Sequence, residues 1–168
     1  MKWIGTGVAI AVCLCFAALL FLVLHPVQGW RAQVILSGSM RPTIAPGTLI
    51  FTRKQPEWTY REGDIITFHP PIKTGSLVTH RLTRVYLNAH SIRVFDTKGD
   101  ANINGDGWQI SPGSVVGRYR WGIPYVGYLL VWVKTPIGFL VFTLIFFFSA
   151  VLPELFFLWG ELSKQKGG

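Results

Sequence analysis

The sequence predicts a mostly β protein, in which a compact antiparallel β domain is flanked by two transmembrane α-helices. Short β-branched runs fill the middle of the 168-residue chain, and Gly, Pro, Asn and Asp separate them. Long apolar segments stand at both ends of the chain. Because this length suits a single domain, we expect one β-rich domain at residues 31–121 between two membrane segments.

The first apolar segment covers residues 3–24, which include no charged side chain. As a helix it would be about 33 Å long, enough to cross a hydrocarbon core of about 30 Å. A cleaved secretory signal is the alternative, but such signals have an apolar core of about 7–15 residues and a small-x-small exit. Val27-Gln28-Gly29 is a poor exit, so we expect an uncleaved N-terminal anchor.

Six short runs in the middle of the chain have the composition of strands. Turn-forming sequences such as Ala45-Pro46-Gly47 and Pro70-Pro71 separate them. No apolar stripe with helical spacing is sustained there over ten residues. The expected strands are Val34–Leu36, Thr48–Thr52, Asp64–Phe68, Leu77–Leu87, Ser91–Phe95 and Ser114–Tyr119.

Apolar residues return after the β domain. We expect residues 122–135 to form an interfacial or packed segment that ends near Lys134. Residues 136–159 follow as the second transmembrane helix, since Pro136 is suited to a first helical turn. Two spans would place both chain ends on the same side of the membrane.

The distribution of Lys and Arg addresses the orientation of these spans. Lys2, Lys164 and Lys166 would make the side of the two termini cytoplasmic. The loop between the spans carries 13 of the 16 Lys and Arg, but the charge rule applies to short loops and this one is roughly 100 residues long. We therefore expect a two-span protein of the plasma membrane with an extracytoplasmic β domain.

The net charge indicates which partners the chain could bind, and the positions of the cysteines show whether they could form a disulfide in the β domain. The formal net charge of +8 suits an anionic lipid surface, whereas no basic run or recognition motif points to nucleic acid. Cys13 and Cys15 lie inside the first apolar segment, so they cannot form a disulfide within the β domain. We expect no metal and no cofactor, because the chain shows no credible ligand cluster.

The candidate chemistry begins with the string Ser37-Gly38-Ser39-Met40-Arg41-Pro42-Thr43, about a dozen residues after the first apolar segment. A serine hydroxyl attacks an amide when a base lies in hydrogen-bond reach and donors stabilise the oxyanion. Ser39 is the candidate nucleophile. The backbone N–H of Ser39 and the hydroxyl of Ser37 are the candidate oxyanion donors, although a Ser-Gly-Ser turn alone is usually structural.

The serine string resembles the nucleophile motif of type I signal peptidases. Other segments resemble boxes of the same family in the same order along most of the domain. These segments are Gly47-Thr48-Leu49-Ile50, Arg61-Glu62-Gly63-Asp64-Ile65-Ile66, Gly75-Ser76-Leu77-Val78-Thr79-His80-Arg81, Lys98-Gly99-Asp100-Ala101-Asn102 and Ile123-Pro124-Tyr125-Val126-Gly127. Ala101 departs from the commoner Gly-Asp-Asn spelling, which leaves the role of Asn102 open.

The resemblance implies which residue is the base. Common bacterial members have Lys where this chain has His80, and His resembles the endoplasmic-reticulum type, which also occurs in archaea and some Gram-positive bacteria. A histidine with an ordinary pKa near 6.5 is a competent base at neutral pH. His25, His69 and His90 have less suitable surroundings in the sequence. Lys73 lies seven residues before His80 and outside the motif.

A carboxylate commonly fixes the tautomer of a catalytic histidine. Asp100 and Asp106 are the two candidates, six residues apart in a Gly- and Asn-rich loop. The resemblance implies that acidic residues matter at both places. We expect Asp106 to orient His80 and Asp100 to shape the loop; capping of turns is the alternative for both.

The family resemblance implies a membrane-bound serine endopeptidase that removes signal peptides from exported preproteins. It also implies small residues at the first and third positions before the cut, and accessory membrane subunits as in the eukaryotic complex. One alternative is a membrane-tethered, non-catalytic β module that binds a partner or scaffolds a secretion complex. Another is a self-cleaving repressor-type protease, but such proteases are soluble and use a lysine base.

Overall fold

The computed structural model describes residues 21, 29–72, 75–148 and 159. The expected N-terminal anchor at residues 3–24 lies outside these residues except for Phe21. The last part of the expected second span, residues 149–158, also lies outside them. The chain divides into two compact units, and residues 22–129 form the unit that contains every described strand.

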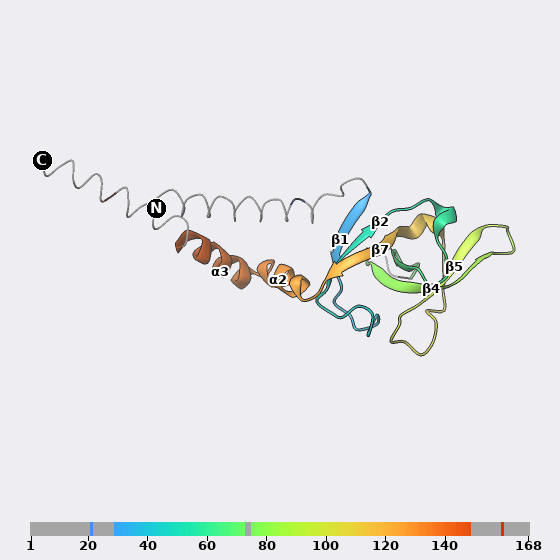
Figure 1. Ribbon diagram of the computed structural model, residues 1–168, viewed down its shortest axis with the longest axis horizontal. Helices are drawn as coiled ribbons and strands as arrows, with labels where there is room; N and C mark the ends of the chain where they lie inside the picture. Colours follow the sequence, from blue (N-terminus) through green and yellow to red (C-terminus); the bar gives the residue numbers. More distant parts are fainter. Residues whose placement is uncertain (1–20, 22–28, 73–74, 149–158, 160–168) are drawn as a thin grey trace, which may run out of the picture. The chain divides into compact units, whose positions relative to one another are not determined.

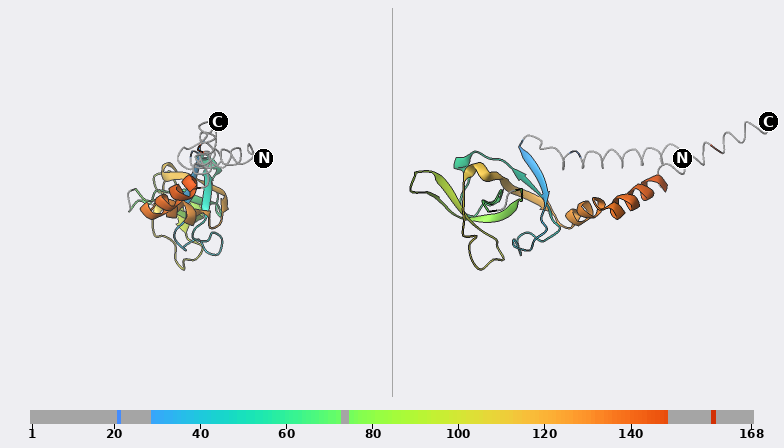
Figure 2. Two further views of the ribbon diagram at one scale, coloured as in Figure 1. Left: turned by 90° about the vertical axis from the view of Figure 1, so that its left-hand side faces the viewer. Right: turned by 180° about the vertical axis from the view of Figure 1, so that it is seen from behind.

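One seven-stranded sheet forms the β unit, with the strand order β1-β2-β7-β3-β4-β5-β6. All of its ladders are antiparallel, and the sheet is strongly curved (Figures 1 and 2). The prediction of a mostly antiparallel β domain is therefore confirmed. The strands are β1 (Trp30–Val34), β2 (Leu49–Arg53), β3 (Ile65–Phe68), β4 (Val78–Leu87), β5 (Arg93–Lys98), β6 (Gln109–Ile110) and β7 (Val115–Ile123).

The first strand differs from its prediction, because β1 spans Trp30–Val34 and not Val34–Leu36. It pairs with β2 from Trp30 opposite Arg53 to Val34 opposite Leu49. Ile35 still exchanges backbone hydrogen bonds with Thr48 and Gly47, and the chain turns away only after it, where the side chain of Leu36 is exposed. The apolar run that suggested a strand at Val34–Leu36 therefore belongs partly to the turn that leads to Ser39.

Two further strand predictions were wrong at their ends. The fifth strand begins at Arg93 and not at Ser91, because residues 88–92 form a turn. In this turn Ser91 has a φ of 56°, and the side-chain carbonyl of Asn88 accepts the N–H groups of His90 and Ile92. The last strand continues past Tyr119 to Ile123, since this extension pairs with β2.

Two clusters of apolar side chains form the core of the β unit. The larger one includes Tyr60, whose ring meets Phe95 edge-on with the centroids 5.8 Å apart. The second cluster contains Met40, the residue after the candidate nucleophile, which is completely buried. The larger cluster is Tyr60, Ile66, Phe68, Leu82, Phe95, Ile110 and Val115, and the second is Ile35, Met40, Ile44, Ile50 and Ile65.

Two short 3₁₀ helices and two α-helices complete the described elements. The 3₁₀ helices are Glu57–Thr59 and Pro112–Ser114, and the α-helices are α2 (Val126–Val133) and α3 (Pro136–Phe146). Thr135 caps α3, since its hydroxyl accepts the backbone N–H of Gly138 at 3.0 Å. The segment at residues 122–135, expected to be interfacial or packed, thus contains the end of β7 and an α-helix.

The start of α2 packs tightly on the turn before β2. The backbone N–H of Gly127 donates to the carbonyl oxygen of Gly47 at 2.9 Å. A Cβ atom at Gly127 would lie 2.4 Å from Cγ1 of Val34 and 2.6 Å from that same oxygen. Glycine is therefore required at residue 127 by this close approach.

The apolar helices α2 and α3 bear on the expected second span. Within the described part of the chain, neither is long and apolar enough to cross a bilayer alone. By length and composition the two meet the requirement only when taken together, and they are bent by 98° at the break between them.

Candidate active site

The candidate nucleophile Ser39 lies in a turn held by backbone hydrogen bonds. The N–H of Arg41 donates to the carbonyl of Gly38 at 3.0 Å, and the N–H of Ile44 donates to Met40 at 2.9 Å. The carbonyl of Ser39 itself accepts the N–H of Ala101 at 2.8 Å. With Met40 buried beside it, Ser39 is fixed on one side by the core and on the other by the loop after β5.

His80 lies on β4 and points its ring at Ser39. Its Nε2 atom is 3.1 Å from the hydroxyl oxygen of Ser39, and its Nδ1 atom is 2.6 Å from Oδ2 of Asp106. A carboxylate can only accept, so Nδ1 carries the proton and, in the neutral ring, Nε2 carries the lone pair. His80 is therefore in the tautomer that can accept a proton from Ser39.

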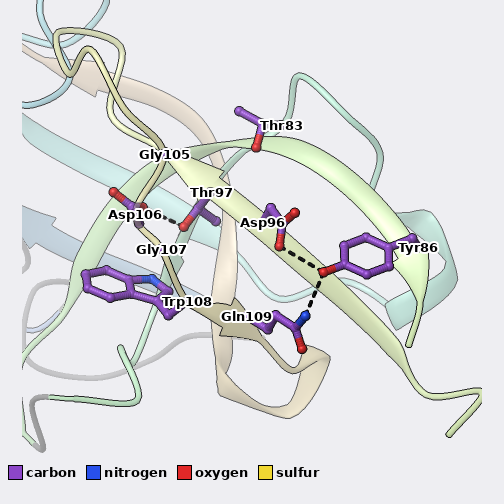
Figure 3. A pocket seen from close by; sticks show the side chains of 9 residues that line it. All are labelled: Thr83, Tyr86, Asp96, Thr97, Gly105, Asp106, Gly107, Trp108 and Gln109. Atoms are coloured by element: carbon purple, nitrogen blue, oxygen red, sulfur yellow. Dashed lines mark hydrogen bonds between the residues drawn. The ribbon is translucent and has the colours of Figure 1, made fainter. Parts of the chain in front are cut away.

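Asp106 is held for this task by β5. The Thr97 hydroxyl donates to Oδ2 of Asp106 at 2.6 Å, as Figure 3 shows, and the backbone N–H of Asp106 donates to the Thr97 carbonyl at 2.9 Å. The side chain of Asp106 is only 5% exposed. Sequence reasoning missed Thr97, because an inward-facing threonine in a β-branched strand carries no separate signal.

Asp100 has other partners. Nε and Nη2 of Arg81 donate to its two carboxylate oxygens at 2.8 and 2.7 Å, and the hydroxyl of Thr43 also donates to it. The hydrogen bond from Arg81 is the main reason that the pKa of Asp100 lies below its ordinary value. Nη1 of Arg81 donates to the carbonyl of Gly63 at 2.8 Å. This network connects the residue after His80 with the turn after Ser39.

The hydroxyl of Ser37, the second candidate oxyanion donor, lies 3.2 Å from the hydroxyl of Ser39. It is exposed, so its proton can rotate toward an oxygen that develops beside Ser39. The structure thus brings together Ser39, His80, Asp106 and Ser37. The carboxylate of Asp100 binds Arg81 and does not bind the imidazole.

The loop after β5 approaches the nucleophile very closely at Gly99. A Cβ atom at this residue would lie 2.6 Å from the carbonyl oxygen of Ser39 and 2.9 Å from Nδ2 of Asn102. The N–H of Asn102 donates to the carbonyl of Gly99 at 3.0 Å. Gly99 and Asn102 therefore shape the turn that supports Ser39.

The other histidines and Lys73 were not expected to act as the base. The structure places His90 in the turn between β4 and β5, where its N–H donates to Asn88. The N–H of His69 donates to Ser114 at the end of β3. His25 and Lys73 lie outside the described residues.

A cavity of about 480 Å³ borders Asp106 (Figure 3). On its wall the Tyr86 hydroxyl donates to Asp96 at 3.2 Å, and the side-chain amide of Gln109 donates to the Tyr86 oxygen at 2.8 Å. Ser39 and His80 are not part of its lining, which consists of Thr83, Tyr86, Asp96, Thr97, Gly105, Asp106, Gly107, Trp108 and Gln109.

A serine hydroxyl, an imidazole and a buried carboxylate thus form one hydrogen-bonded line in the β unit. This combination of groups is typical of serine hydrolases that act by acyl transfer.

Comparison with known proteins finds relatives that are named signal peptidases. The chain is 34% identical over 106 residues to the human signal peptidase complex catalytic subunit SEC11C, an alignment that covers 58% of this chain and 54% of the relative. Signal peptidase I W of Bacillus subtilis is 33% identical over 94 residues, covering 55% of this chain and 48% of that relative. The subunit SEC11 of Zygosaccharomyces rouxii is 28% identical over 109 residues, with 60% and 64% covered.

These relatives confirm the resemblance to signal peptidases that the motifs predicted. The chain spans about half the length of the first two relatives. No protein-family model matches the chain.

Proposed function

We propose that this protein is a membrane-bound serine endopeptidase that removes N-terminal signal peptides from exported preproteins. The observation that carries the proposal is the hydrogen-bonded line from Ser39 through His80 to Asp106. The chain's similarity to proteins named signal peptidases supports the choice of substrate. In this proposal Asp100 does not touch the reacting groups; its role is to hold Arg81, the residue after the base His80.

The reaction would proceed by acyl transfer. The Ser39 oxygen attacks the scissile carbonyl carbon while its proton passes to Nε2 of His80. The C–N bond then breaks, and His80 returns the proton to the leaving amine, which leaves an ester on Ser39. A water molecule next gives a proton to His80 and attacks the ester; Ser39 leaves and recovers the proton. Asp106 stabilises the imidazolium in both halves of the reaction.

Two groups would stabilise the oxyanion in each half of the reaction. The backbone N–H of Ser39 is the first donor, and the exposed hydroxyl of Ser37, 3.2 Å from the Ser39 hydroxyl, is the second. Removal of one such donor typically costs about 2.7–4 kcal/mol of transition-state stabilisation.

An extended substrate fits the edge of β4 beside His80. Val78, Thr79 and His80 pair with β3, whereas the ladder to β5 starts at Arg81. In the described part of the chain, the other edge of Val78–His80 therefore faces no strand. A peptide that adds to this edge would gain main-chain hydrogen bonds. The family resemblance supplies the preference for small residues at the first and third positions before the cut.

The membrane setting is also part of the proposal. The apolar segment at residues 3–24 and the helices α2 and α3 would hold the protein in the plasma membrane, with the β unit on the extracytoplasmic face and both termini in the cytoplasm. Exposed aromatic side chains near the start of α2, including Trp121, Tyr125 and Tyr128, suit the headgroup region of a bilayer. Because relatives are named catalytic subunits of a complex, the proposal includes accessory membrane subunits as partners.

The direct test follows cleavage of a secretory precursor by the full-length protein in detergent between pH 5 and 9. We expect the Ser39→Ala and His80→Ala variants to lose cleavage, while His90→Ala, which changes a histidine in the distant turn, cleaves at the wild-type rate. A serine-directed fluorophosphonate should label the wild-type protein and fail to label Ser39→Ala. Cleavage that survives Ser39→Ala would remove the proposed mechanism.

A further inference from the structure

Three polar side chains meet in the interior of the β unit. The side-chain amide of Gln33 on β1 donates to the hydroxyl of Thr67 on β3 and, at 3.1 Å, to the hydroxyl of Thr79 on β4. The two hydroxyl oxygens are 2.7 Å apart. Thr67 is completely buried and Thr79 is 7% exposed, so these hydrogen bonds are largely shielded from water.

The Gln33 amide connects strands that are not neighbours. The strand order places β2, β7 and β3 between β1 and β4. The curvature of the sheet (Figure 2) brings the inner faces of β1 and β4 together, and the amide bridges them. This side-chain link therefore fixes the position of β1 relative to β4 independently of the ladders.

Both ends of the link lie close to candidate site residues along the chain. Thr79 directly precedes His80, and Gln33 lies six residues before Ser39. We propose that Gln33 is a positioning residue, which sets the separation of Ser39 and His80 by joining the strand before the nucleophile to the strand of the base. The inference rests on the proposed function, since it assigns Gln33 a task in that reaction.

The reaction rate is sensitive to the distance between Ser39 and His80 that Gln33 would set. The Ser39 oxygen and Nε2 of His80 are 3.1 Å apart, near the upper limit of a good hydrogen bond. A misplacement of about 1 Å between reacting groups can cost about 100-fold in rate. Ala101 and Asp106 hold Ser39 and His80 from the loop after β5, and the buried Met40 holds Ser39 from the core. Gln33 adds a link that joins the strand before Ser39 directly to the strand of His80.

Fold stability alone gives little reason for a glutamine at this place. Oε1 of Gln33 is buried and accepts no hydrogen bond from the described residues. A buried polar atom without a partner destabilises the folded state. An apolar side chain of similar size would avoid that cost, so replacing Gln33 separates a role in folding from a role in the site.

The test compares Gln33→Leu with the wild-type protein, both full-length and in detergent. We expect Gln33→Leu to keep or slightly raise the Tm, to lower kcat for precursor cleavage about 10-fold and to leave KM within about threefold. The rate of Ser39 labelling by a fluorophosphonate should fall about as much as kcat, because labelling needs the same alignment but no bound precursor.

Two further variants complete the experiment. Thr52→Val is the matched control, because Thr52 is a buried polar residue on β2 whose hydroxyl bonds to Arg31 on β1 and does not reach β4. It should leave kcat and labelling unchanged. Thr79→Val breaks the same link from the other end, so the double variant with Gln33→Leu should be no slower than the slower single variant.

The results of these experiments test the positioning role of Gln33 separately from the proposed function. Labelling and kcat of Gln33→Leu within twofold of wild type would overturn the inference, as would a loss that only follows a lower Tm. A wild-type protein that is neither labelled nor active contradicts the proposed function. In that case the NMR signal of the His80 Nδ1 proton decides: a shifted or broadened signal in Gln33→Leu supports the positioning role, and an identical signal overturns it.

Discussion

At the residue scale, the two aspartates of the loop after β5 have different partners and therefore different roles. Asp106 meets the imidazole of His80 and the hydroxyl of Thr97, whereas Asp100 meets Arg81 and Thr43. Ser39, His80 and Asp100 are identified as candidates because each stands in a recognisable motif, and Asp106 is identified by its place in the Gly- and Asn-rich loop and by the family resemblance. Thr97 could not be found in this way, since its task depends on a ladder that brings β5 beside the loop. Changes at Asp106 and Asp100 should therefore have different consequences.

Asp106→Asn should lower kcat with little change in the Tm. The amide can present its NH₂ group to Nδ1 and so favour the wrong tautomer of His80, for which a loss on the order of 10⁴-fold is typical. Precursor cleavage and thermal melting of the same preparation measure both effects. Asp96→Asn is the matched control on the wall of the same cavity, and its kcat should remain within about threefold of wild type. Equal losses in both variants would contradict the assignment.

Asp100 should make folding sensitive to acid. Its pKa is lowered in the folded state, mainly by the hydrogen bond from Arg81, so folding favours the charged form. The resulting stability is fully present above the ordinary value of 3.8 and is lost as the pH falls through the lowered pKa.

The Asp100→Asn variant tests this linkage. The side chain of Arg81 is 34% exposed and that of Asp100 is 14% exposed. Because solvent weakens such a pair, we expect it to contribute about 1 kcal/mol or less to the free energy of unfolding. Urea unfolding at several pH values between 2 and 5 should show a shallower fall in the free energy of unfolding for Asp100→Asn than for wild type. Identical slopes would exclude Asp100 as a source of the acid sensitivity.

At the element scale, the central ladders are easier to predict than their ends. The runs that became β2, β3 and β4 are bounded by clear turn residues, so their predicted ranges agree with the structure to within a residue or two. The two-residue β6 is too short to give a pattern. The displacement of β1 and the extension of β7 depend on their pairing with β2, which no local sequence pattern contains.

Gly99→Ala should disturb the site through its backbone. The added Cβ would lie 2.6 Å from the carbonyl oxygen of Ser39, so the turn that carries the nucleophile must shift. We expect kcat to fall at least 10-fold, because small misplacements of reacting groups are costly. Gly105→Ala is the control in the same loop, since its nearest contact would be 3.7 Å from the Thr97 carbonyl. Equal activity of the two variants in precursor cleavage would show that the turn around Ser39 tolerates the shift.

At the scale of the whole molecule, the β unit contains everything that its core requires. Both apolar clusters lie within residues 35–115, and the line from Ser39 to Asp106 lies in the same unit. The curvature that brings Gln33 to Thr79 could not be predicted from the sequence, because it arises from the whole sheet. The unit should therefore be separable from the apolar segments at the two ends of the chain.

A fragment of residues 29–129 should fold cooperatively in mild detergent. Detergent is needed because Trp121, Tyr125, Tyr128 and Leu129 are exposed apolar side chains near its end. A single thermal transition by circular dichroism, together with fluorophosphonate labelling of Ser39, would establish an autonomous unit. A gradual loss of signal without a transition would show that the remaining segments are needed for folding.

The complete burial of Met40 has a consequence for how the protein responds to heat. Since the neighbouring residue is part of the core, Ser39 cannot lose its orientation by a local fluctuation of an independent loop. Inactivation and global melting should therefore occur over the same temperature range, without a prior stage in which an intact fold carries a misaligned serine. Residual labelling of Ser39 during heating then reports the fraction of folded molecules, even in membranes where spectroscopic melting curves are hard to record.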